Sequence, residues 1–241
     1  MAVPCKINQN FFKFWSPKMA YILGYFAADG CMFKNSRGAF YVEFTSIDKD
    51  LIYNVKVAMG SGHKIGTYKH KNSKWKDRYR IQIGSKIIFQ DLIRIGFCPA
   101  KSKIIKFPKV PVACLPDFIR GYFDGDGHVV SGVYKRSNRK SLQQRVFSVR
   151  FTSGSKDFLE GLRDSLWKHN RVEGGSIFKK RGNCFELSFS TRDALRLFSF
   201  MYRVENKGDS IYYLERKHRI FIKAIDCGDV DQLVRSHPCH G

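Results

Sequence analysis

Two short, mostly apolar phrases of the sequence each end in an aspartate that is followed by glycine. They end at Asp29-Gly30 and at Asp126-Gly127, and in both a Gly-Tyr-Phe run begins five residues before the aspartate. Two carboxylates held close together repel each other unless a proton or a cation lies between them. Hard oxygen ligands suit Mg²⁺, so we expect a divalent-metal site that activates water for phosphodiester hydrolysis. The alternative is that each aspartate only ends a helix in an Asp-Gly turn, a common use of this dipeptide.

The elements that must position these aspartates are two helices, expected over about residues 17–28 and 116–125. Each carries two small residues four positions apart on one face, and these are Gly24, Ala28, Gly121 and Gly125. Small residues let two helix backbones approach closely. A glycine inside a helix costs about 1 kcal/mol relative to alanine. Its presence in both copies therefore predicts a close helix–helix seam that brings Asp29 and Asp126 together.

The same order of elements follows each helix. The alternating apolar and polar residues of 40–46 align with those of 147–153, and a similar amphipathic helix follows each of these strands. This predicts an α+β fold built from a duplicated αββαββα unit, with a four-stranded antiparallel sheet in each half. A long C-terminal helix is expected over 209–225. The predicted organisation is an N-terminal half over 1–105, a Pro-rich linker over 106–114, a C-terminal half over 115–226 and a tail over 227–241.

The charge balance predicts an anionic polymer as the partner. The chain has 241 residues and a formal net charge of +22, from 43 Lys and Arg against 21 Asp and Glu. No apolar run is long enough to span a membrane, and the basic residues are dispersed rather than gathered on one amphipathic helix, so nucleic acid is favoured over a membrane surface. The seven cysteines are scattered without a C-x-x-C pair, and the N-terminus has no secretory pattern. We expect an intracellular protein, in the cytoplasm or an organelle matrix.

The two phrases resemble the signature of the LAGLIDADG homing endonucleases in their single-chain, two-motif form. The second phrase, Phe118–Gly127, is the more typical, whereas the first departs at Ala27, where the motif often has aspartate. The resemblance covers about residues 16–225 and includes the phrase Tyr213–Lys217. It implies two sheets that form a DNA-binding saddle around a central helix pair. It also implies a monomer that cuts both strands of a long, non-palindromic duplex with Mg²⁺, or with Mn²⁺ or Ca²⁺ in its place, and leaves short 3′ overhangs.

The resemblance also implies roles for individual residues. The acids Asp29 and Asp126 would be catalytic and would bind metal together with the backbone carbonyls of Ala28 and Gly125. Two basic residues near the scissile phosphates would be Lys101 and Lys207, although each could instead be a solvated surface lysine. Asp48 and Ser155 stand where the family often has a polar residue that contacts the attacking water.

The bases of the DNA would be read by the outward-facing residues of the strands. Arginine and lysine read guanine, and asparagine and glutamine read adenine. On this basic face, Glu43 and Glu186 could accept from the amino group of cytosine. Taken singly, each of these residues could equally be a solvated surface residue. The first half contributes Asn35, Arg37, Tyr41, Glu43, Thr45, Lys69, Lys71, Arg78, Arg80 and Gln82, and the second Tyr134, Arg136, Arg139, Lys140, Ser148, Arg150, Thr152, Lys180, Glu186 and Ser188.

Other functions fit the same fold. An intron RNA maturase or a non-catalytic DNA-binding protein would share the resemblance. Loss of one acid would indicate a binder, and both acids are present, but a maturase could keep both. An intein-embedded domain is not expected, because the first position lacks a nucleophile and the chain ends in His240-Gly241. We expect a freestanding reading frame inside a group I intron.

Overall fold

The helices and strands of this chain fall into two units of similar topology. The computed structural model describes residues 5–69, 76–135, 143–202 and 212–226. One unit comprises Met1–Asp126 with Gly208–Tyr213, and the other comprises Gly127–Lys207 with Leu214–Gly241. The division of the chain at residues 106–114 stays a prediction.

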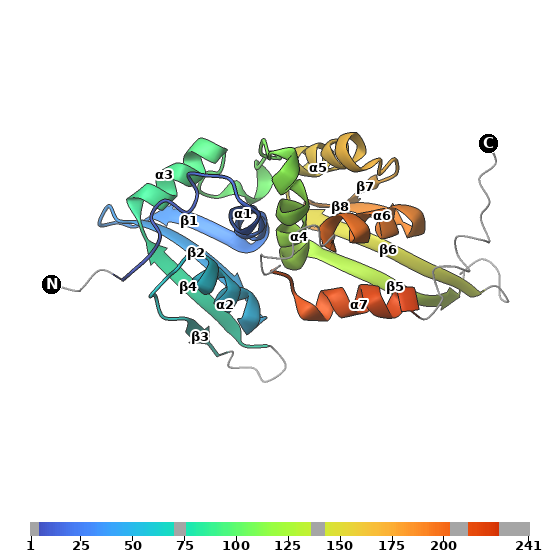
Figure 1. Ribbon diagram of the computed structural model, residues 1–241, viewed down its shortest axis with the longest axis horizontal. Helices are drawn as coiled ribbons and strands as arrows, with labels where there is room; N and C mark the ends of the chain where they lie inside the picture. Colours follow the sequence, from blue (N-terminus) through green and yellow to red (C-terminus); the bar gives the residue numbers. More distant parts are fainter. Residues whose placement is uncertain (1–4, 70–75, 136–142, 203–211, 227–241) are drawn as a thin grey trace. The chain divides into compact units, whose positions relative to one another are not determined.

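The first unit contains one sheet in the strand order β1-β2-β4-β3, with every neighbouring pair antiparallel. Helices α2 and α3 pack against β2 (Figure 1). The elements are α1 (Pro17–Asp29), β1 (Gly30–Lys34), β2 (Phe40–Ser46), α2 (Lys49–Ala58), β3 (Gly66–Tyr68), β4 (Arg78–Gly84), α3 (Lys86–Ile95), the 3-10 turns Lys101–Lys103 and Val112–Cys114, and α4 (Leu115–Asp126).

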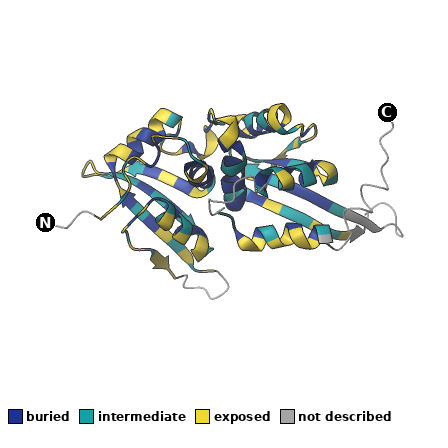
Figure 2. Ribbon diagram, in the orientation of Figure 1, coloured by how far each residue is buried: buried dark blue, intermediate teal, exposed yellow. Residues whose placement is uncertain are grey.

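Alternation along the strands decides which side chains enter the core of this unit. Val42 and Phe44 of β2 are fully buried, as are Ile81 and Ile83 of β4, whereas the residues between them face away from the helices. Figure 2 shows the same change of burial from residue to residue along the strands. The predicted DNA-contacting residues of β2 and β4 therefore share the sheet face that these helices leave uncovered, and they are Tyr41, Glu43, Thr45, Arg78, Arg80 and Gln82.

The helix ends of the first unit carry the capping residues that their sequences indicate. The Ser16 hydroxyl accepts a hydrogen bond from the Met19 amide at 3.1 Å and starts α1, and Ser85 does the same for Ile88 at the start of α3. Gly96 ends α3 with a left-handed backbone at φ 110°. The Ser16 cap fixes the residue at which α1 begins, and the helix then ends at Asp29.

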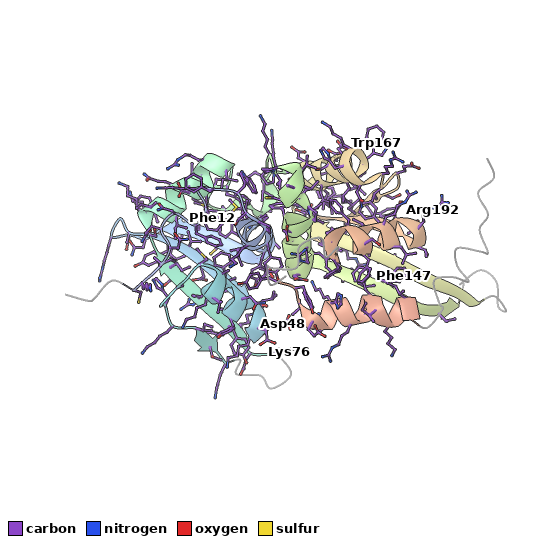
Figure 3. All side chains as sticks on the ribbon, in the orientation of Figure 1. Phe12, Asp48, Lys76, Phe147, Trp167 and Arg192 are labelled. Atoms are coloured by element: carbon purple, nitrogen blue, oxygen red, sulfur yellow. The ribbon has the colours of Figure 1, made fainter. Side chains whose placement is uncertain are left out.

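The second unit repeats the sheet in the order β5-β6-β8-β7. Phe147 of β6 points toward α7 (Figure 3), where its ring lies 6.1 Å from that of Phe221. The described residues thus form two four-stranded antiparallel sheets and seven α-helices, which confirms the predicted α+β fold. The elements are β5 (Gly127–Lys135), β6 (Gln143–Ser153), α5 (Lys156–Asn170), β7 (Ser176–Lys180), β8 (Cys184–Ser190), α6 (Thr191–Tyr202) and α7 (Glu215–Asp226).

The C-terminal helix is shorter than the sequence pattern indicated. It was expected to begin at residue 209, but residues 212–214 are not helical and α7 begins at Glu215. The Tyr212 carbonyl accepts a hydrogen bond from Arg120 Nε at 2.8 Å, and the Tyr212 ring stacks on Tyr21 at 5.8 Å. These contacts with α4 and α1 hold the segment out of the helix. Among the described helices, none combines the length and the apolar character needed to cross a membrane.

Candidate active site at the ends of two packed helices

Helices α1 and α4 touch backbone to backbone within the first unit. A Cβ atom added to Gly24 would lie 2.0 Å from the Phe118 carbonyl oxygen, and one added to Gly121 would lie 2.0 Å from the Tyr21 carbonyl oxygen. Both distances are far inside van der Waals contact, so only glycine fits at these two positions. Figure 1 shows the two helices side by side, and Figure 2 shows both buried over most of their length. All four small residues of the predicted seam lie on these two helices.

The carboxylates of Asp29 and Asp126 end the two helices. A Cβ atom on Gly125 would lie 2.4 Å from Ala28 Cβ and 3.4 Å from Asp29 Oδ2. The Asp29 carboxylate therefore lies against the last turn of α4, next to the residue that precedes Asp126. Asp29 is exposed and Asp126 is partly exposed, so a phosphate from solvent can reach this end of the helix pair.

Lys101 is a buried cation at the end of α1. Its side chain is only 5% exposed, and Nζ donates a hydrogen bond to the Ala27 carbonyl at 2.9 Å. Burial lowers the pKa of Lys101 to about 8, and the carboxylates of Asp126 and Asp29 oppose this shift. Lys101 is therefore a buried lysine at the end of α1 and not a solvated surface lysine.

The aspartate that the first motif lacks is a structural residue in the second. Asp124 is buried, and Tyr21 of α1 donates its hydroxyl to Asp124 Oδ2 at 2.8 Å. When the two phrases are aligned on their glycines, Asp124 corresponds to Ala27 and Tyr21 corresponds to Phe118. The polar pair Tyr21 and Asp124 thus corresponds to the apolar pair Phe118 and Ala27. Both members of the pair change together, tyrosine to phenylalanine and aspartate to alanine.

Two buried cations at the motifs were not among the predicted site residues. Arg120 in α4 is buried, donates to the Tyr212 carbonyl and forms an ion pair with Asp117. Lys217 in α7 is buried, and its Nζ donates to the carbonyl of Gly127, the residue that follows Asp126 in the chain. The phrase Tyr213–Lys217 is a sequence signal for Lys217, but its burial is evident only from the fold.

The strand residues of the first unit already contact one another. Asn35 Oδ1 accepts from the amides of Arg37 and Ala39 at 3.0 and 2.9 Å, so Asn35 closes the turn between β1 and β2. Glu43 accepts from Gln82 Nε2 at 3.1 Å and also lies near the Arg80 guanidinium. The exposed members of the predicted set in this unit are Arg37, Lys69, Arg78 and Arg80, and the partly exposed members are Asn35, Tyr41, Glu43, Thr45 and Gln82.

The second unit has a similar cluster. Glu186 forms ion pairs with Arg150 at 3.3 Å and with Lys180 at 3.2 Å. Ser148 is buried beside them, and Thr152 and Ser188 are partly exposed. The predicted residues that lie outside the described part of the chain are Lys71, Arg136, Arg139, Lys140 and Lys207, and the side chain of Tyr134 is likewise not described.

The two polar residues assigned to the attacking water occupy equivalent helix starts. Asp48 immediately precedes α2 (Figure 3). Ser155 precedes α5, is buried, and accepts a hydrogen bond from the Phe158 amide at 3.3 Å. Because its hydroxyl caps a helix, Ser155 has a structural role.

The donor set at the helix ends fits a hard cation. In the part of the chain that the structure describes, no three His, Cys, Asp or Glu side chains gather as a metal cluster. A cation would therefore depend on the carboxylates of Asp29 and Asp126 together with main-chain carbonyls such as those of Ala28 and Gly125. Oxygen atoms of these two kinds are the ligands of Mg²⁺ and Ca²⁺ in proteins.

A sequence model for the LAGLIDADG-like domain matches residues 16–95 and 115–168, with one motif in each segment. The chain belongs to this family. It is also 24% identical, over 196 residues, to an uncharacterised protein of Methanocaldococcus jannaschii. That match covers 76% of the chain and 65% of the relative, so the chain spans just under two thirds of the relative's length.

Solved LAGLIDADG structures share the fold. The meganuclease I-AabMI bound to uncleaved DNA superposes with a TM-score of 0.61 at 16% identity, over 90% of this chain and 92% of the meganuclease. The meganuclease I-SmaMI, bound to an uncleaved DNA target in the presence of calcium ions, gives a TM-score of 0.60 at 16% identity, over 92% and 93% of the two chains. Because the sequence identity to these structures is only 16%, the structural similarity establishes the fold and nothing further.

Proposed function

We propose that this protein is a site-specific double-strand DNA endonuclease that hydrolyses one phosphodiester in each strand at Asp29 and Asp126. The observation that carries the proposal is the contact of the Asp29 carboxylate with the last turn of α4, which ends at Asp126, where the buried cation Lys101 is bonded to Ala27 of α1. Acidic oxygen donors bind divalent cations, and a cation beside them attracts a phosphate. Membership of the LAGLIDADG family and the net charge of +22 support the same conclusion.

The residues of the site have separate tasks. Asp29, Asp126 and the carbonyls of Ala28 and Gly125 would hold Mg²⁺, for which Mn²⁺ or Ca²⁺ could substitute. When bound, the cation supplies a Lewis acid and lowers the pKa of water. Lys101, when protonated, would stabilise negative charge on the phosphate.

The sheet faces would bind the duplex on either side of the cut. In each unit the residues that face away from the helices are mostly polar or basic, and they differ between the two units. A monomer with two unequal sheets recognises a non-palindromic target, because each sheet reads its own half-site. Short 3′ overhangs and an origin inside an intron remain expectations from the family resemblance.

The test uses the full chain and a plasmid library with a long randomised duplex insert. Cleavage in MgCl₂ followed by sequencing of the cut ends should yield one long consensus with staggered cuts, and EDTA should abolish it. Asp29→Asn and Asp126→Asn should each abolish cleavage while binding of the selected duplex in CaCl₂ persists. Normal cutting by both variants would show that the carboxylates do not perform the chemistry.

A further inference from the structure

The uncovered sheet face of each unit carries one carboxylate–arginine pair, and the charges are exchanged between the two units. In the first unit the acid is Glu43 on β2 and the base is Arg80 on β4, 3.6 Å apart. In the second unit the base is Arg150 on β6 and the acid is Glu186 on β8, 3.3 Å apart. Each pair connects the two central strands of its sheet.

Strand register shows that the two pairs occupy equivalent places. Thr45 of β2 pairs with Arg80, and Thr152 of β6 pairs with Glu186. Glu43 lies two residues before Thr45, and Arg150 lies two residues before Thr152. Both ion pairs are therefore the same diagonal contact between neighbouring strands, with acid and base interchanged.

In both pairs the acid is the less exposed partner. The Glu43 side chain is 15% exposed against 55% for Arg80, and the Glu186 side chain is 9% exposed against 30% for Arg150. A buried carboxylate needs partners, and each acid has two: Gln82 with Arg80, and Lys180 with Arg150. In each acid the protein partners contact one carboxylate oxygen, Oε2 of Glu43 and Oε1 of Glu186, and the arginines are the more exposed members of the pairs.

The second pair also retains unused hydrogen-bonding capacity. Ser148 Oγ and Arg150 Nε are buried and have no hydrogen-bond partner among the described residues. Leaving such groups unpaired costs free energy. An ion pair on the sheet surface adds little stability by itself, so stability alone does not account for two such pairs at equivalent positions.

We propose that Glu43 and Glu186 are positioning residues that hold Arg80 and Arg150 to read one guanine in each half-site. On the sequence alone, the two acids could instead accept directly from the amino group of cytosine. In the proposed arrangement the reading arginine comes from β4 in the first unit and from β6 in the second. The inference rests on the proposed function, because it assumes a duplex DNA ligand.

The test is selection by binding, in CaCl₂, from a randomised duplex library with the full chain. Glu43→Gln and Arg80→Gln are expected to lower the preference for guanine at the same base pair, each by about tenfold, the scale of one good bidentate contact. Glu186→Gln and Arg150→Gln, as separate variants, should both lower the preference for guanine at one base pair of the other half-site. The control is Glu160→Gln, which removes the 2.8 Å pair between Lys156 and Glu160 on α5 and should leave the profile unchanged.

The outcomes separate this inference from the proposed function. If Glu43→Gln alters a base pair that Arg80→Gln leaves unchanged, or alters none, the positioning role is wrong. If the wild type selects no sequence, the proposed function itself fails. Should Glu186→Gln not fold, the exchange Arg150→Glu with Glu186→Arg keeps the pair and should move the preferred guanine to a neighbouring base pair. An unmoved preference in that variant overturns the inference.

Discussion

The hydroxyl of Tyr21 donates a hydrogen bond to the carboxylate of Asp124 across the contact between α1 and α4, with 2.8 Å between the two oxygen atoms. The equivalent place on the other side of the seam holds Phe118 and Ala27. The helix pair therefore has one polar and one apolar version of the same contact. This accounts for the departure of the first motif from its family pattern without any loss at the acidic end.

Tyr21→Phe should destabilise the protein by about 1–3 kcal/mol, because a buried carboxylate loses a hydrogen-bond donor. The measurement is urea unfolding followed by circular dichroism. The double variant Tyr21→Phe with Asp124→Ala copies the apolar pair of the other side and should recover part of the loss. If Tyr21→Phe unfolds at the wild-type urea concentration, the hydrogen bond does not stabilise the helix pair.

Gly24→Ala should be among the most damaging single substitutions. Its Cβ would lie 2.0 Å from the Phe118 carbonyl oxygen, so two helix backbones would have to move apart. Overpacking of this kind costs about 3 kcal/mol or more, and thermal unfolding would measure it. Gly62→Ala is the control, because its nearest contact would be 3.4 Å and its melting temperature should change little. Equal melting of the two variants would contradict the close approach.

Lys101 should make stability rise with pH in alkaline solution. Its pKa is about 8 in the folded protein against an ordinary value of 10.5, so between these pH values the unfolded chain binds more protons. The free energy of unfolding attributable to Lys101 therefore increases across this window, by up to about 1.4 kcal/mol per pH unit. The difference between wild type and Lys101→Met, measured in EDTA, isolates this effect. A difference that does not vary with pH would show that the lysine titrates normally.

Lys217→Met should weaken the second unit and slow DNA cleavage. The buried ammonium donates to the Gly127 carbonyl, and Gly127 is bonded directly to Asp126. Loss of a charged hydrogen bond costs about 1.5–3 kcal/mol, and unfolding and cleavage assays should both report it. Lys223→Met removes an exposed charge from the same helix and is the control. If the two variants behave alike, the buried contact has no role.

The strands and helix starts could be predicted because their causes are local. The alternation over residues 40–46 predicted β2, which has the same bounds in the structure, and Ser85 and Gly96 are local residues that cap the two ends of α3. The contact between α1 and α4 was predicted because each helix carries two small residues four positions apart. The start of α7 could not be predicted in this way, because the Tyr212 carbonyl is bound by Arg120, which is far away in the sequence.

The sequence could propose the two acids and Lys101 as a site, but it could not predict the contacts that surround them. Glu43 pairs with Arg80 because β2 lies beside β4 in the sheet. The order of the strands in the sheet cannot be read from how far apart the two residues are in the sequence. The alternation of apolar and polar residues along the strands indicated that Glu43 and Arg80 face away from the core. It did not indicate that Arg80 would be the more exposed of the two. The burial of Lys217 has the same origin, since it depends on how α7 packs against β5.

Asp124 and Asp126 provide a test of the chemistry within a single motif. Asp124→Asn keeps the shape of a side chain that is buried and bonded to Tyr21, so cleavage should remain within about threefold of wild type. Asp126→Asn removes a charge at the exposed end of the helix pair and should lower the cleavage rate by about 10²-fold or more. Single-turnover cleavage of the selected duplex measures both, and binding in CaCl₂ controls for folding. If the two variants lose activity equally, the carboxylate at the end of α4 has no special part in the reaction, and the assignment of the chemistry to Asp29 and Asp126 is wrong.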